Sequence, residues 1–384
     1  MGSLNLSKYI SKKHCTLLGI GPMSKNCVDV VIDLANTYDI PLMLIASRRQ
    51  IESEKLGCGY VNNWSTEEFA GYVKKKDVGN NIILCRDHGG PYQNEDKNNQ
   101  KKSFKEVMND AKESFRTDIE SGFNIIHIDP SENLGVELKI EEMMERIFEL
   151  YDFCHNVSKQ TQKEIQIEIS IGKEDGEISK FSEIKYVIEQ MKKFCLKKKI
   201  PLPLFIVIKT GNHVLETQNI GILDDIIKGK YDKERKEIQK IIKYCKNEKI
   251  LIKEHNGDYL LDKTLREHPI IGIDAVNVAP EFGVVETRAI LSYLSKNNLE
   301  EFEQRFLDIS FNSKKWKKWM TKNSNLSNND KAIISGHYVF SSKEFRKLKD
   351  EIVEKIDNKD DFDNFLKSEI KKVILKYLEC LKII

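Results

Sequence analysis

The chain has 384 residues, of which 40% are hydrophobic and 32% charged, so it can bury a sizeable core and is not expected to be disordered. The 62 Lys and Arg nearly balance the 60 Asp and Glu, and a net charge of +2 predicts neither a nucleic-acid partner nor a membrane partner. The eight cysteines form no CxxC pair, and neither a signal peptide nor a membrane span is visible, so we expect a cytoplasmic protein with reduced, mostly buried thiols.

Short apolar runs recur along the chain, and each is followed by a longer stretch with the periodicity of an amphipathic helix. The eight predicted strands are Thr16–Ile20, Leu42–Ala46, Ile82–Cys85, Asn124–Ile128, Ile165–Ile169, Leu204–Ile208, Ile250–Ile252 and Ile270–Val278. Eight alternations over roughly 290 residues favour an α/β fold, a closed (β/α)₈ TIM barrel with parallel strands. An open doubly wound sheet is the alternative, which fits less well because no glycine-rich phosphate turn follows the first strand.

The region after residue 297 has a different pattern, rich in Lys, Asn and Ser, and it ends in the amphipathic segment EIKKVILKYLECLKII. We therefore predict a barrel over residues 1–297 and a helical C-terminal extension over residues 298–384 that packs on the barrel. Its one strand-like run is His337–Phe340. The basic segment Lys314–Met320 is predicted to be a solvated helix face with its tryptophans turned inward, in preference to a basic aromatic binding patch.

Polar residues occupy the predicted strand ends, where the catalytic residues of such barrels lie. The residues selected by this rule are Arg48, Arg49 and Gln50 after the second strand, Asp87 and His88 after the third, His127 and Asp129 in the fourth, Glu168 in the fifth, His213 after the sixth, His255, Asn256, Gly257 and Asp258 after the seventh, and Asn277 in the eighth.

Three histidines and a carboxylate at the ends of four different strands predict a metal site. His88, His213, His255 and Glu168 could hold Zn²⁺ or a similar divalent ion with one position left open for substrate. Neighbouring residues of a strand point to opposite sides, so His88 is predicted to bind the metal while Asp87 acts as the catalytic acid or base. For each histidine taken alone, a hydrogen-bonded loop residue is the alternative.

The loops after the seventh and eighth strands are the usual phosphate site of this fold. They offer Asn256, Gly257, Asp258 and Asn277, and a helix predicted to begin near Gly283 adds N-terminal amides that suit an anion. Simple turn residues are the alternative interpretation of this segment.

Two adjacent arginines follow the second predicted strand on the same face. Arg48 or Arg49 is predicted to contact an anionic group of the substrate, because guanidinium groups bind phosphate and carboxylate oxygens in pairs. Gln50 and Asp129 are further predicted substrate contacts. A surface arginine pair is the alternative.

Several segments, in the same order, resemble a known family. They are LIASRRQ, IILCRDHGGP, SGFNIIHIDPS, IEISIG and KEHNGDYLLDKTLREHPIIGIDAVNVAPEFGVVETRAI, from about Ile20 to Arg288. They are similar to the non-catalytic (accessory) subunit of class II tagatose-bisphosphate aldolase, once labelled tagatose-6-phosphate kinase. The resemblance implies a barrel related to class II ketose-bisphosphate aldolases and sugar-phosphate 4-epimerases. It also implies that Asp87 matches the proton-transferring carboxylate, His88 a metal ligand and His255 the histidine of a Glu-Ala-His segment.

Two functions follow from the resemblance. The first is a metal-dependent aldolase (a lyase) or C4-epimerase (an isomerase) that acts on a phosphorylated ketose by retro-aldol chemistry in carbohydrate metabolism. The second is a non-catalytic subunit that stabilises a class II tagatose- or fructose-bisphosphate aldolase, with another aldolase subunit or a second copy of the chain as partner. Retention of Asp87, His88, Glu168 and His255 favours the enzyme. A kinase is not predicted, because the chain has no GxxxxGK[ST] motif.

The chain also departs from the family pattern. Arg48 and Arg49 stand where the family usually has Ser-Asn, Asn256-Gly257 replaces Ser-Thr, and His213 stands where a glutamate is expected. A ketose phosphate other than tagatose bisphosphate, or an acidic sugar, is therefore an alternative substrate.

Overall fold

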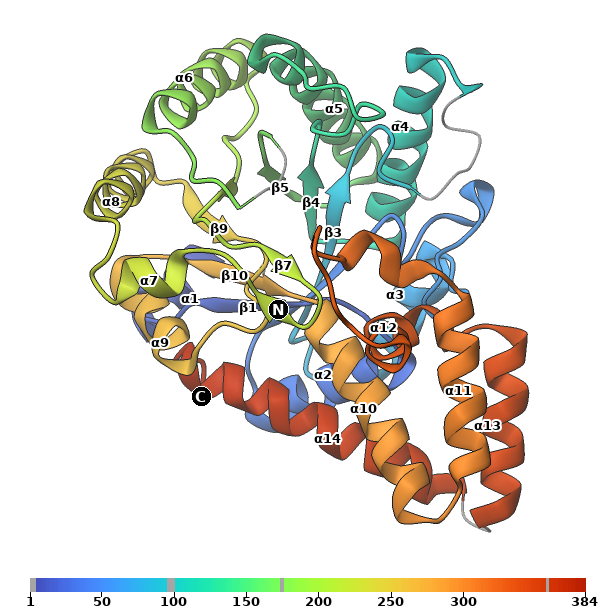
Figure 1. Ribbon diagram of the computed structural model, residues 1–384. Coiled ribbons are helices and arrows are strands. Elements are labelled where there is room, and N and C mark those ends of the chain that lie inside the picture. Colours follow the sequence, from blue (N-terminus) through green and yellow to red (C-terminus); the bar gives the residue numbers. More distant parts are fainter. Residues whose placement is uncertain (1–4, 95–100, 173–175, 357–358) are drawn as a thin grey trace.

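The computed structural model, which describes residues 5–94, 101–172, 176–356 and 359–384, contains a closed barrel of parallel strands surrounded by helices (Figure 1). The order of strands around the barrel is β1-β10-β9-β6-β5-β4-β3-β2. Their bounds are β1 (Leu17–Ile20), β2 (Leu42–Ser47), β3 (Ile82–Gly89), β4 (Ile125–Ile128), β5 (Gln166–Ile169), β6 (Phe205–Ile208), β9 (Leu251–Glu254) and β10 (Ala275–Val278). The predicted (β/α)₈ barrel is confirmed, and the open sheet is excluded.

Several of the helices outside the barrel begin at a capping side chain. Ser24, Ser65 and Ser103 each accept a hydrogen bond from a backbone amide in the first turn of the helix that follows. The helices are α1 (Leu6–Lys13), α2 (Lys25–Tyr38), α3 (Thr66–Lys76), α4 (Phe104–Ser121), α5 (Ile140–Thr161), α6 (Phe181–Lys198), α7 (Leu223–Ile227), α8 (Asp232–Asn247), α9 (Asp262–Ile271) and α10 (Pro280–Lys296), with a short 3₁₀ helix η1 (Glu54–Leu56). A hairpin of β7 (Val214–Leu215) and β8 (Gln218–Asn219) follows β6.

Each predicted strand overlaps an observed one, and two of them differ most in their bounds. The last one begins at Ala275 and not at Ile270, because α9 continues to Ile271 and ends at Gly272, whose φ of 95° suits glycine. The third strand is longer than predicted and continues through the polar residues to Gly89. Its last residues therefore belong to the barrel wall and not to a loop.

The barrel interior changes from apolar to polar along the strands. Alternate residues of a strand share one face, so Ile83, Cys85 and Asp87 of β3, and Ile125 and His127 of β4, follow one another along the interior. The apolar members form a buried cluster with residues of α1 at the N-terminal end of the barrel. That end is therefore closed, and the polar members lie at the C-terminal end, where loops can admit a ligand.

The described residues after 298 are mostly helical, which agrees with the predicted helical extension. It forms α11 (Glu300–Asn312), η3 (Lys315–Trp319), α12 (Asn328–Ser335), η4 (Gly336–Tyr338), α13 (Lys343–Ile356) and α14 (Lys359–Cys380). A second core unites Phe306, Phe345 and Phe362 of this extension with Ile290 and Leu294 of α10. The long helix α14 runs beside α10 and α2, so the extension packs on the barrel (Figure 1).

Two details of the extension differ from the prediction. The run His337–Phe340 is not a strand: it begins in η4, where His337 is buried against α10 and close to Gly283. The segment Lys314–Met320 forms a 3₁₀ helix in place of the predicted α-helix. Its Trp316 stacks on Phe311, as expected for an inward tryptophan, while Lys318 and Trp319 line a pocket.

The state of the cysteines agrees with the expectation from the sequence. All eight cysteines are free thiols, and all except Cys58 are buried. Within the described ranges, no helix is both long enough and apolar enough to cross a membrane.

Candidate functional site

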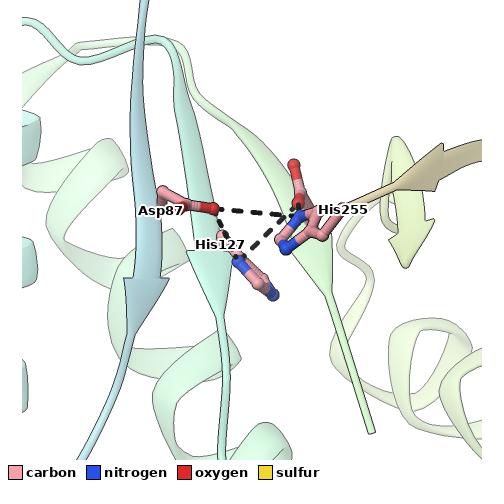
Figure 2. A group of neighbouring side chains, drawn as sticks. Asp87, His127 and His255 are labelled. Atoms are coloured by element: carbon pink, nitrogen blue, oxygen red, sulfur yellow. Dashed lines mark hydrogen bonds and ion pairs between the residues drawn. The ribbon is translucent and has the colours of Figure 1, made fainter. Parts of the chain in front are cut away.

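Four side chains from the ends of four different barrel strands converge at the C-terminal end of the barrel (Figure 2). Asp87 comes from β3, His127 from β4, Glu168 from β5 and His255 directly follows β9. One donor atom from each lies within 4.8 Å of the others, and all four residues are buried. Oε1 of Glu168 is 3.2 Å from Nε2 of His255 and 3.7 Å from Nδ1 of His127. Two imidazoles and two carboxylates in this arrangement form a candidate metal site.

A local irregularity in β3 brings two neighbouring side chains to one side. The pairing register with β4 shifts between Arg86 and Gly89, and His88 has a φ of 42°, which is unusual for a residue other than glycine. As a result, Asp87 and His88 both line the same pocket. The predicted placement of the two side chains on opposite sides holds for a regular strand and is wrong here, because β3 is irregular at this point.

His88, a predicted ligand, lies at the edge of the four-residue cluster and is held by Asp129. Its Nδ1 is 2.8 Å from Oδ2 of Asp129, and its Nε2 is 3.6 Å from Oδ2 of Asp87. Its ring centroid is 5.5 Å from that of His127 and 5.0 Å from that of His255. Carboxylates commonly orient metal-binding histidines in this way. Asp129, predicted to touch substrate, instead holds His88 and accepts a hydrogen bond from Gln93.

A buried lysine forms an ion pair with Glu168 of the cluster. Lys253 of β9 donates a hydrogen bond of 2.6 Å to Oε2 of Glu168. Burial alone would raise the pKa of Glu168, but the ammonium of Lys253 and the nearby histidines lower it to about 2. Glu168 is therefore ionised at neutral pH, and its other oxygen, Oε1, faces the histidines.

Asp87 is ionised for a similar reason. Burial alone would raise its pKa, but His88, His127 and His255 together hold that pKa far below the usual value. Nδ2 of Asn277 donates a hydrogen bond of 3.2 Å to Oδ1 of Asp87. Asn277 fits there because residue 19 is glycine: a Cβ at Gly19 would lie 2.3 Å from Oδ1 of Asn277.

A pocket opens above the cluster. Asp87, His88, His255 and Asn277 line its floor, whereas His127 and Glu168 are not among its lining residues in the described chain. The walls come from loops of the barrel and from the extension, and they include Arg49, Gln50, Asn256, Asp258, Lys318 and Tyr338. A ligand in this pocket would therefore meet Asp87 and His255 directly, while His127 and Glu168 support the floor.

The two predicted substrate arginines have separate environments. Arg49 lines the pocket. Arg48 is buried: its Nε is 2.6 Å from Oε2 of Glu52, and its Nη1 donates to the carbonyl of Gly90. Of the two arginines, only Arg49 is therefore placed to contact a ligand. Arg48 links the segment after β2 to the segment after β3 through its bonds to Glu52 and Gly90. Gln50 lines the pocket, but its Oε1 accepts from the amide and hydroxyl of Ser47.

His213, predicted as a fourth ligand, does not join the cluster. It lies in the loop before β7, where its amide donates to Oδ1 of Asn219. Within the described residues, the candidate metal cluster contains the predicted ligand Glu168 and also His127, which was not predicted as a ligand. The sequence does contain a signal for His127, because this residue lies two positions after Ile125 on the interior face of β4.

The predicted phosphate loop is occupied by a side chain of the protein itself. The helix α10 begins at Pro280, earlier than the predicted Gly283, and Oδ1 of Asp258 accepts from the amides of Ala279 and Glu281 at 3.0 and 2.8 Å. Burial and the neighbouring Glu281 raise the pKa of Asp258 to about 8. The amides expected to bind a substrate anion are therefore already capped.

The other two residues of that loop have structural reasons for their identity. Asn256 lines the pocket with a φ of 58°, and its carbonyl accepts from Nδ2 of Asn219. Gly257 allows close packing on β10, because a Cβ there would lie 2.4 Å from Cγ2 of Val276.

Comparison with solved structures finds proteins of the same fold. A probable tagatose 6 phosphate kinase from Sinorhizobium meliloti 1021 matches with a TM-score of 0.73 and 15% identity, covering 95% of this chain and 100% of that one. A fructose-bisphosphate aldolase from Campylobacter jejuni matches with a TM-score of 0.58 and 13% identity, covering 99% and 93%. At these identities the similarity shows the fold alone. No family model and no curated protein matches the chain.

Proposed function

We propose that the protein is an enzyme that cleaves or epimerises a phosphorylated ketose by metal-assisted aldol chemistry. The observation that carries the proposal is the convergence of Asp87, His127, Glu168 and His255 under a pocket at the C-terminal end of the barrel. The fold shared with a fructose-bisphosphate aldolase and the family resemblance in the sequence both support it.

The donor set suits a divalent ion such as Zn²⁺. Imidazole nitrogen and carboxylate oxygen are its usual protein ligands, and three of them leave a position for substrate. Nε2 of His127 is 2.9 Å from Oγ of Ser170, which directs Nδ1 toward the cluster. Nδ1 now accepts a hydrogen bond of 3.1 Å from the amide of His88, so binding an ion through this atom replaces that bond. His127, Glu168 and His255 are the proposed ligands, with His88 beside them.

Aldol cleavage beside a ketone builds negative charge on oxygen, and a bound divalent ion stabilises such charge as a Lewis acid. Asp87 is the proposed proton-transfer group, because its carboxylate is ionised and lines the pocket, although the residue is largely shielded from bulk solvent. Asn277 holds its carboxylate in place through Oδ1. His255 lines the pocket beside it, so a substrate hydroxyl at the floor can reach the base and the ion-binding face together.

A screen of purified, Zn²⁺-loaded protein against ketose mono- and bisphosphates tests the proposal. Cleavage would appear as a triose or aldehyde product, and epimerisation as a new sugar phosphate in the NMR spectrum. The structural alternative, a subunit that stabilises an aldolase partner, gains support if no ketose phosphate reacts while the chain raises the stability of a co-expressed class II aldolase. The buried charges favour the enzyme, since burying ionised groups costs stability that a purely structural subunit need not spend.

A further inference from the structure

The mouth of the pocket is built jointly by the barrel and the C-terminal extension. Lys318, Trp319 and Tyr338 of the extension line the same pocket as Asp87 and Arg49 of the barrel. Residues more than 200 positions apart in the sequence therefore face one ligand space. The extension forms part of the pocket wall as well as packing on the outside of the barrel.

Hydrogen bonds fix this part of the extension above the barrel. The amide of Glu216, in the β7–β8 hairpin, donates to the carbonyl of Trp319 at 2.7 Å. Oε1 of Glu216 accepts from the hydroxyl of Thr321 at 2.8 Å. Nε1 of Trp319 donates to the hydroxyl of Tyr338 at 3.2 Å, and the ring of Tyr338 packs on Tyr60 with centroids 4.9 Å apart. The segment η3 is thus held between a barrel hairpin and an aromatic pair.

The aromatic rings place a cation at the mouth. Nζ of Lys318 lies 5.0 Å from the ring centroid of Trp319 and 4.9 Å from that of Tyr338. Cation–π attraction favours this placement of the ammonium. Arg49 supplies a second cation from the loop after β2. Both positive groups lie on the wall of the pocket, and Asp87 lies on its floor.

The phosphate position usual for this fold is not available. Oδ1 of Asp258 already accepts from the amides of Ala279 and Glu281 at the start of α10. A phosphate there would have to displace a buried carboxyl group from its hydrogen bonds. A substrate phosphate needs another set of donors.

We propose that Lys318 of the extension, together with Arg49, binds the phosphate group of the substrate at the mouth of the pocket. The substrate then spans from this phosphate to the acid–base group Asp87 on the floor. This inference relies on the proposed function for the identity of the substrate, whereas the phosphate site itself can be tested without turnover.

Calorimetric titration of the Zn²⁺-loaded protein with inorganic phosphate at low ionic strength tests the site. The variants are Lys318→Ala and Arg49→Ala, and Lys317→Ala is the matched control, because Lys317 is an exposed neighbour that does not line the pocket. Loss of a charge-assisted hydrogen bond should raise the Kd for phosphate about tenfold or more in the first two variants. The control should bind phosphate like the wild type.

The outcomes separate this proposal from the function above. Weaker phosphate binding in Lys318→Ala supports the site even if no ketose phosphate reacts. Equal binding in Lys318→Ala and Lys317→Ala, or no measurable binding by the wild type, overturns the site even if the protein turns over a ketose phosphate. With a reacting substrate, Lys318→Ala should raise KM and leave kcat nearly unchanged, as expected for binding energy that the ground and transition states share.

Discussion

Nζ of Lys253 lies 2.6 Å from Oε2 of Glu168, and each side chain is only 1% exposed. Lys253→Met should lower the free energy of unfolding by about 3–5 kcal/mol, because it leaves the buried Glu168 without its counter-charge. Denaturant titration measures this loss. The double variant Glu168→Gln with Lys253→Met should lose less than the sum of the two single variants. Additive losses would show that the two charges do not depend on each other.

Asp87 is expected to be essential for turnover but not for retention of the ion. Asp87→Asn keeps the size of the side chain and an oxygen that can accept from Asn277, but it removes the base. The rate should fall by about 10²–10⁴, the usual contribution of general acid–base catalysis. Steady-state kinetics with elemental analysis of the same sample measures both properties. A variant that turns over at the wild-type rate would remove Asp87 from the proton-transfer role.

The adjacent arginines should give different phenotypes. Arg48→Ala leaves Glu52 buried without its ion pair and should cost about 3–5 kcal/mol of stability. Arg49→Ala should leave the melting temperature nearly unchanged and raise KM about tenfold, because Arg49 lines the pocket. Thermal unfolding and kinetics of the two variants, compared side by side, distinguish a structural arginine from a binding one. The reverse pattern would contradict the placement of both residues.

A buried carboxyl group in α10 predicts a pH-dependent stability. Burial raises the pKa of Glu286 from 4.5 to about 7, and its Oε1 accepts from Asn26 at 3.0 Å. The folded state keeps the proton that the unfolded chain loses above pH 4.5, so this contribution is present at low pH and is lost as the pH rises to about 7. The shift corresponds to about 3 kcal/mol at most.

Glu286→Gln removes this titration. The variant should gain stability relative to the wild type as the pH rises from 5 to 8, measured as the difference between their melting temperatures at each pH. A difference that stays constant over this range would show that Glu286 is already ionised in the folded protein at pH 5.

The sequence predicted the fold because its signals are local. Each strand, such as Leu42–Ser47, is an apolar run, and each following helix carries its own periodicity and often a serine cap. Predicted strand ends are accurate to within one residue where the strand itself stops at the change in polarity. They are inaccurate in β3 and β9, which continue through polar residues to Gly89 and Glu254. The position of His127 is also a local signal. Because side chains alternate along β4, His127 shares the interior face with Ile125, and this alternation predicts its place in the cluster.

Other parts of the site depend on distant contacts. The bulge that turns both Asp87 and His88 to the pocket arises from pairing with β4, which the sequence of β3 does not reveal. Arg48 and Arg49 look equivalent in the sequence, and only the position of Glu52 and Gly90 in the fold separates them. Lys318 reaches the pocket because the extension docks over the barrel, so no motif around it could have predicted its place.

The proposed function requires that the cluster under the pocket hold a divalent ion. The most direct measurement is the ion content of Zn²⁺-loaded, desalted protein by elemental analysis, in the wild type, His255→Ala and the control His213→Ala, whose histidine lies outside the cluster. We expect a single ion per chain in the wild type and in His213→Ala, and loss of the ion in folded His255→Ala. A wild type without bound ion, or equal ion content in all three proteins, would contradict it.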